Sequence, residues 1–167
     1  MDEAIKTSAL SQNIWKMTIK ELCKQASRNL LNIYFTAGFP ELNSMQVLLE
    51  ALAASKVDMV EIGITYSDPL SDGPVIQNSN SIALKNGITL QLIFNQLSKI
   101  NTPTPKIMMG YYNTILQFGV ERFCQKCAET GISGLILPDL PIDIWLTDYK
   151  TIFDKCCLVI IFPVNNT

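Results

Sequence analysis

The stretch VEIGITYSDPLSDGP, residues 60–74, joins an apolar run to a loop that carries several carboxylates. The apolar part of this stretch, residues 60–64, contains a single acid, Glu61, and the loop that follows holds Asp68 and Asp72 among prolines and glycines. Short and nearly continuous apolar runs are typical of parallel strands that helices cover on the outside. The stretch therefore predicts an α/β fold in which carboxylates lie at and just beyond the end of a parallel strand.

Apolar runs and helical periodicities alternate along the rest of the chain in the same way. The expected strands are residues 32–38, 57–63, 106–113, 134–140 and 157–164. The expected helices are residues 17–28, 42–55, 74–86, 89–99, 118–129 and 142–155. The predicted order is four β/α units and a fifth strand, with an extra helix in front of the first strand.

Two architectures accommodate five parallel strands in this order. One is a doubly wound, flavodoxin-like sheet, and the other is part of a (β/α)8 barrel, which typically needs about 250 residues. The 167 residues suffice for a single domain, expected to span residues 1–167. Because the last predicted element is a strand without a covering helix, the ending resembles a truncation, and both architectures stay open.

Composition and charge narrow the possible functions. The net charge of −2 gives no electrostatic reason to bind nucleic acid or an anionic membrane. The N-terminus does not resemble a signal peptide, and no apolar run approaches the roughly 20 residues of a membrane span, so we expect a cytoplasmic protein. The chain has no histidine, so Glu, Asp, Tyr, Lys or Cys must carry any proton transfer.

Five cysteines include the pair Cys124 and Cys127, spaced as C-x-x-C. Both fall on one apolar stripe of the expected helix 118–129, together with Val120 and Phe123. This placement favours buried structural thiols over a redox pair or a zinc site, either of which needs further partners that the sequence does not clearly supply. No metal site is predicted.

Polar residues gather after the carboxyl ends of the predicted strands, where both architectures bind their ligands. Glu61 is the sharpest candidate, because a carboxylate in a buried strand loses hydration and becomes suited to exchange protons near neutral pH. Asp72, Tyr111 and Asp139 follow the ends of three different strands. This asymmetry between the two ends of the strands predicts a site that works through carboxylates.

Each polar candidate also has a purely structural interpretation. Glu61 could form an ion pair with a lysine or arginine, and Asp68 before Pro69 is an ordinary turn pair. Asp72 and Asp139 stand where an aspartate commonly caps a following helix. From the residues alone, these alternatives stay open.

Four segments together resemble one known family. They are FTAGFP (35–40), VEIGITYSDPLSDGPVIQNSN (60–80), MMGYYNTILQFG (108–119) and GLILPDLP (134–141). In order and spacing they resemble the tryptophan synthase alpha chain family, and the likeness runs from about residue 14 to about residue 160. The resemblance implies a (β/α)8 TIM barrel, here a partial barrel with about five of the eight parallel strands and an N-terminal extra helix.

The resemblance also implies an activity. The family is a lyase that cleaves indole-3-glycerol phosphate to indole and glyceraldehyde 3-phosphate in tryptophan biosynthesis, by a retro-aldol reaction without a metal or cofactor in this chain. Glu61 matches the general acid/base that protonates indole C3, and Asp72 matches the carboxylate that holds the indole N–H. Two carboxylates in different environments can divide such work without histidine. Pyridoxal phosphate is expected only in the beta partner.

Further residues match the substrate pocket and the partner surface of the family. The residues that match the lining of the indole pocket are Tyr34, Met109, Tyr111 and Ile136. The residues that match the face docking on the beta chain, in an expected α2β2 heterotetramer, are Asp68, Pro69, Asn113, Asp139 and Pro141. The family grips phosphate with loops after strands six to eight, so the alternative expectation is a truncated, inactive remnant that at most docks on the beta chain.

Overall fold

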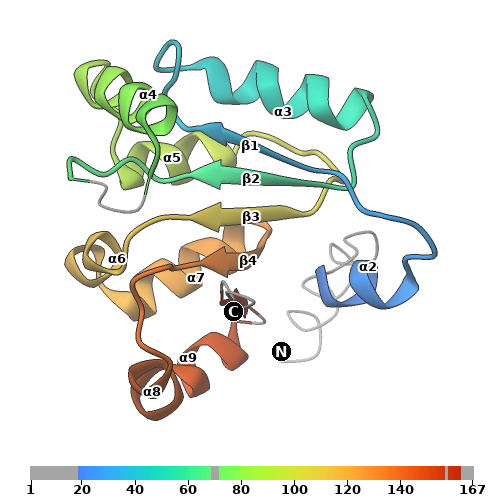
Figure 1. Ribbon diagram of the computed structural model, residues 1–167, viewed down its shortest axis with the longest axis vertical. Helices are drawn as coiled ribbons and strands as arrows, with labels where there is room; N and C mark the ends of the chain where they lie inside the picture. The colour runs from blue at the N-terminus through green and yellow to red at the C-terminus, as the bar shows by residue number, and fades with distance from the viewer. Residues whose placement is uncertain (1–18, 69–71, 157, 163–167) are drawn as a thin grey trace, which may run out of the picture.

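The computed structural model describes residues 19–68, 72–156 and 158–162. Its five strands are all parallel and form one sheet in the order β1-β2-β3-β4-β5 (Figure 1). The strands are β1 (Asn32–Thr36), β2 (Met59–Gly63), β3 (Lys106–Met109), β4 (Ile132–Ile136) and β5 (Val159–Ile161). A doubly wound sheet reverses its strand order at a switch point, so this sequential order excludes that alternative and corresponds to part of a barrel wall.

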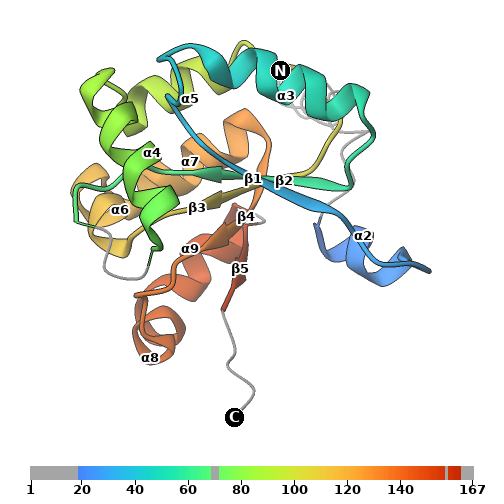
Figure 2. The ribbon, with the colours of Figure 1, turned by 45° about the horizontal axis from the view of Figure 1, so that its top comes forward.

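The helices lie between consecutive strands, apart from α2, which precedes β1. They are α2 (Ile19–Gln25), α3 (Ser44–Ala54), α4 (Pro74–Lys85), α5 (Leu90–Leu97), α6 (Tyr112–Phe118), α7 (Val120–Thr130), α8 (Ile142–Ile144), the π-helical turn η1 (Trp145–Tyr149) and α9 (Lys150–Lys155). Figures 1 and 2 both place α2 at the end of the strands opposite to α4 and α6. No helix within the described residues is long and apolar enough to cross a membrane.

The hydrophobic core lies between the sheet and the helices that cover it. The buried strand residues of this core include Val60, Ile62, Met108 and Leu135. Phe94 of α5 packs against Phe118 and Phe123, with ring centroids 5.6 Å apart in both pairs. Since strand residues alternate between faces, the residues between these core positions face the opposite, inner side of the sheet.

The two cysteines of the C-x-x-C pair belong to this core. Cys124 and Cys127 are both fully buried on α7 as free thiols, as the helical stripe predicts. Burial raises the pKa of Cys124 to about 12 and holds the pKa of Cys127 well above its usual value. Thiols that stay protonated are poor nucleophiles and poor metal ligands, which supports the structural interpretation.

The predicted strand 106–113 is wrong in its second half. β3 ends at Met109, and α6 begins at Tyr112, where a strand end was expected. The backbone N–H of Tyr112 donates to both carboxylate oxygens of Asp139, at 2.9 and 3.2 Å. Asp139 therefore caps α6, rather than the helix that follows Asp139 in the sequence, and this contact starts a helix where local patterning favours a strand.

The other boundaries differ by smaller amounts. The predicted helix 142–155 is divided into α8, η1 and α9. Ile142 and Leu146, which an α-helical period would place on one apolar stripe, are 54% and 50% exposed. A π-helical turn changes the spacing of side chains around the axis, which is why a strictly α-helical periodicity misplaces them. β4 begins at Ile132 instead of Gly134, and β5 does not include Leu158 or Phe162, while residues 157, 163 and 164 of the predicted strand lie outside the described residues.

Gly134 permits a close contact inside the sheet. A Cβ at this position would overlap the end of the Ile19 side chain and lie 3.2 Å from Ile107. Ile19 belongs to α2 and is itself buried. The extra helix in front of β1 therefore packs onto the inner face of the sheet at the middle of β4.

Candidate active site

Two rows of inward-facing side chains cross the sheet. In the first row, Tyr34 of β1 lies opposite Glu61 of β2, which lies opposite Ile107 of β3. The second row, one step nearer the carboxyl ends, consists of Thr36, Gly63, Met109 and Ile136. Residues in register point to the same face of a sheet. The structure thus brings four of the predicted site residues, Tyr34, Glu61, Met109 and Ile136, onto one surface.

Glu61 is less deeply buried than the strand pattern predicts. Its side chain is half-buried, and its Oε2 atom accepts a hydrogen bond of 2.7 Å from Nδ2 of Asn32. None of the ion pairs between described residues includes Glu61, so the ion-pair interpretation is not supported. The open side of the sheet explains the exposure, because Glu61 faces inward where no further strand of the described chain covers it.

Asp72 lies just before α4, beyond the carboxyl end of β2. The residue that caps α4 is Gly73, followed by Pro74, and no side chain caps this helix within the described residues. The expectation that Asp72 acts as a helix cap is therefore wrong. Its backbone carbonyl accepts a hydrogen bond from the Gln77 side chain at 2.8 Å, and burial raises the pKa of its carboxyl group.

The raised pKa of Asp72 predicts how its replacement by Asn changes stability with pH. The folded state binds the proton more tightly than the unfolded chain, whose Asp has a pKa of about 3.9. The stabilisation from this proton is complete below that value and is lost as pH rises through the folded pKa. We expect Asp72→Asn to raise the melting temperature at pH 7 and to have no such effect at pH 3.

Thermal unfolding of Asp72→Asn and of the unaltered chain at both pH values measures this difference. The exposed Asp143 on α8 provides a matched control in Asp143→Asn. A gain in melting temperature for Asp72→Asn that is as large at pH 3 as at pH 7 would show that the Asp72 charge is not what lowers the stability of the unaltered chain.

A chain of hydroxyl groups holds Tyr34. Its Oη atom lies 3.2 Å from Oγ1 of Thr36, which lies 2.7 Å from Oγ of Ser79 on α4. Ser79 donates to the carbonyl oxygen of Ile76 at 2.9 Å, so Ser79 must accept from Thr36, and Thr36 must accept from Tyr34. The Tyr34 proton is therefore directed away from the carboxylates, and its oxygen keeps lone pairs free to accept.

Tyr34 also lies near both predicted catalytic carboxylates. Burial raises the pKa of its phenol, and the negative charges of Asp72 and Glu61 raise it further. A neutral tyrosine beside two carboxylates can contribute an apolar ring and a fixed hydrogen-bonding oxygen to a ligand.

Gly63 makes room for the Tyr34 ring. A Cβ at Gly63 would overlap Tyr34 Oη and come within 2.7 Å of Cζ. We expect Gly63→Ala to displace the phenol from Thr36 and to cost about 1–3 kcal/mol of unfolding free energy through overpacking. Urea denaturation measures the loss, and Gly73→Ala is the matched control, since nothing lies within 4 Å of a Cβ there. Equal stability of the two variants would contradict the close packing of the Tyr34 ring against Gly63.

Tyr111 joins the predicted pocket to the predicted partner face. Its buried ring stacks on Tyr66, with centroids 4.9 Å apart and an interplanar angle of 25°. Tyr66 Oη in turn accepts a long hydrogen bond, 3.5 Å, from Nδ2 of Asn113. Sequence reasoning did not single out Tyr66, although an aromatic residue directly after the second strand was a usable signal.

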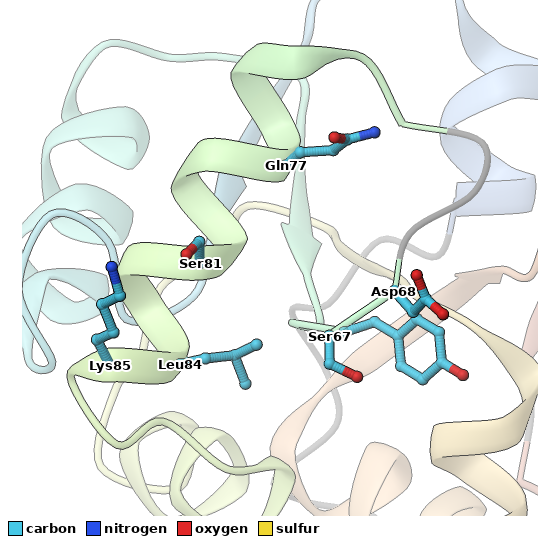
Figure 3. Close-up of a pocket in the computed structure, with 7 residues that line it drawn as sticks. Ser67, Asp68, Gln77, Ser81, Leu84 and Lys85 are labelled. Atoms are coloured by element: carbon cyan, nitrogen blue, oxygen red, sulfur yellow. The ribbon is translucent and has the colours of Figure 1, made fainter.

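The predicted partner residues that the structure describes lie in the segments that follow β2, β3 and β4. Asp68 is exposed and lines a hollow of 550 Å³ between the loop after β2 and α4, as Figure 3 shows. The residues that line this hollow are Tyr66, Ser67, Asp68, Gln77, Ser81, Leu84 and Lys85. The Asp139 carboxylate is engaged in capping α6, and Pro141 is exposed at the start of α8. Pro69 lies outside the described residues.

Fold and site together define a class of protein. An open parallel barrel wall, with carboxylates and tyrosines at and beyond the carboxyl ends of its strands, is typical of (β/α)8-barrel enzymes. A family model described as the tryptophan synthase alpha chain matches residues 20–164. The chain belongs to the tryptophan synthase alpha chain family.

Individual relatives agree with this assignment. The tryptophan synthase alpha chain of Flavobacterium psychrophilum is 52% identical over 143 residues, which cover 84% of this chain and 56% of that relative. The alpha chain of Karelsulcia muelleri is 49% identical over 149 residues, covering 88% and 59%. The crystal structure of the Legionella pneumophila alpha subunit is 34% identical with a TM-score of 0.79, covering 86% and 57%. The chain thus spans a little over half the length of the relatives it matches.

Proposed function

We propose that this chain acts in the cleavage of indole-3-glycerol phosphate to indole and glyceraldehyde 3-phosphate. The observation that carries the proposal is the inner row in which Tyr34 and Glu61 lie side by side, with Met109 and Ile136 one step nearer the strand ends. An apolar and aromatic floor suits the flat indole ring, and the half-buried carboxylate stands in its middle. Asp72 precedes α4, and its charge acts on the Tyr34 phenol.

The proposed roles follow the properties of the two carboxylates. Glu61 delivers a proton to indole C3 and assists cleavage of the carbon–carbon bond that joins the ring to the glycerol side chain. Asp72 accepts a hydrogen bond from the indole N–H and stabilises the positive charge that develops on the ring. Tyr111, stacked on Tyr66, extends the aromatic wall toward the loop after β2. The reaction in this proposal needs no metal or cofactor in this chain.

We further propose a protein partner, the tryptophan synthase beta chain, in an α2β2 tetramer. Asp68 and Asn113 would contact it, both linked to the pocket through the segment that contains Tyr66. Pyridoxal phosphate belongs to that partner in this proposal, and so does the consumption of indole. A cytoplasmic location is part of the same proposal.

A second candidate function is docking on the beta chain without turnover. The observation that favours it is the five-stranded sheet, since the family's phosphate-binding loops are expected after strands six to eight. Such a chain would keep the partner face and the indole floor but would hold the phosphate end of the substrate weakly.

One experiment separates the two candidates. Indole release from indole-3-glycerol phosphate is measured with the purified chain, alone and with the beta chain, and gel filtration of the mixture measures association. Release of indole supports the lyase proposal. Co-elution without any release supports the docking candidate, and the absence of both contradicts both proposals.

A further inference from the structure

The side chain of Asn32 makes a polar contact with the Glu61 carboxylate. Nδ2 of Asn32 donates to Oε2 of Glu61 at 2.7 Å. We propose that Asn32 is a positioning residue for Glu61, fixing one carboxylate oxygen so that the other carries the proton. The inference rests on the proposed function for the chemistry of Glu61, but the contact itself can be tested without it.

The register of the sheet explains how Asn32 reaches this carboxylate. Asn32 lies opposite Met59, and Glu61 lies opposite Tyr34, so the contact runs diagonally between β1 and β2. Both residues face the inner side of the sheet, because each is two positions from another inward-facing residue on its own strand. Diagonal neighbours are about 7–8 Å apart at their Cα atoms, a distance that the longer glutamate side chain and the shorter asparagine side chain bridge together.

The chemistry of the amide determines what this contact can do. An asparagine NH₂ group can only donate, so Oε2 of Glu61 must act as an acceptor in this hydrogen bond. A carboxyl oxygen that accepts here is not the one that bears the acidic proton. Oε1 is therefore the atom at which Glu61 takes up and releases a proton, and the bond to Asn32 limits rotation of the carboxylate during that exchange.

Asn32 also leaves the charge of Glu61 without a compensating cation, because its amide is neutral. The neutral Asn32 amide donates to the Glu61 carboxylate, and the negative charges of Glu61 and Asp72 both act on the Tyr34 phenol. A neutral donor at position 32 orients Glu61 without neutralising it, whereas a lysine there would form an ion pair and hold the anion. The residue type thus suits a group that must exist in both protonation states.

The contact is tested by the NMR signals of the Asn32 side-chain amide in the full chain at neutral pH. One Nδ2 proton bonded to a carboxylate oxygen should resonate apart from the other, and Glu61→Ala should reduce this separation to that of the exposed Asn78 on α4. The backbone amide spectrum shows that the variant remains folded. An Asn32 signal that does not respond to Glu61→Ala overturns the proposal.

The positioning role is tested by kinetics of indole release. Asn32→Ala should lower kcat about tenfold, the loss expected for one hydrogen bond to a charged group, and leave KM within about twofold. Asn32→Gln, which retains the amide, should recover part of the loss, and Asn78→Ala should change neither constant. Full kcat in Asn32→Ala overturns the role. If the unaltered chain releases no indole, the proposed function fails, and the amide signal alone decides whether Asn32 holds Glu61.

Discussion

Glu61→Gln is expected to lower indole release by at least about 100-fold. Glutamine matches the size of glutamate but cannot deliver or accept the proton, and a positioned general acid or base contributes about 10²–10⁴ in rate. The inner row keeps its apolar members in this variant, so binding of indole itself should change little. Indole release from indole-3-glycerol phosphate, measured beside direct indole binding, separates loss of chemistry from loss of the pocket.

The matched control for this experiment is Glu50→Gln. Glu50 is an exposed residue of α3 whose carboxylate accepts a hydrogen bond from Gln46 one turn earlier. The control removes one negative charge at a distance from the inner row and should leave the rate unchanged. Equal rates for Glu61→Gln and Glu50→Gln would show that Glu61 does not transfer the proton.

Phe94→Ala is expected to cost about 3–5 kcal/mol of unfolding free energy. Phe94 is 1% exposed and lies between Phe118 and Phe123, so its removal leaves a cavity that the rigid aromatic neighbours cannot fill by small movements. Single domains are stable by only about 5–15 kcal/mol, so this loss takes up much of the total. Urea denaturation followed by circular dichroism measures the change in unfolding free energy.

An exposed apolar residue provides the control for the cavity. Val47 on α3 is 69% exposed, and Val47→Ala should change the unfolding free energy by no more than about 0.5 kcal/mol. A similar, small loss for Phe94→Ala would mean that the aromatic cluster adds little to stability, and that the sheet and helices are held together elsewhere.

Much of the fold was predictable from the sequence because it depends on local patterns. Apolar runs identify the five strands, and the C-x-x-C stripe correctly predicts the buried face of α7. The start of α6 was not predictable, since the cap on Tyr112 comes from Asp139, 27 residues further along the chain. The π-helical turn at Trp145–Tyr149 could not be predicted either, because the sequence analysis assumes a single α-helical period.

The residues of the candidate site also differ in how far they can be predicted from the sequence. Glu61 and Asp72 stand out in the sequence because acids in or beside an apolar strand are unusual, and their motif resembles one family. Asn32 does not stand out, because its importance comes from a diagonal contact that exists only once β1 and β2 are paired in register. The hydroxyl chain from Tyr34 to α4 depends on tertiary packing in the same way.

The agreement between strand order and sequence order has a consequence for how the chain folds. Each strand pairs with the strand immediately before it, through one intervening crossover, so no pairing between described strands waits for a distant segment. Each pairing still closes a loop that contains a helical crossover, which makes parallel sheets slow to form, but the partner strand always precedes the new strand in the chain. During synthesis, each β/α unit can therefore add to the growing sheet as it leaves the ribosome, from the N-terminal side onward.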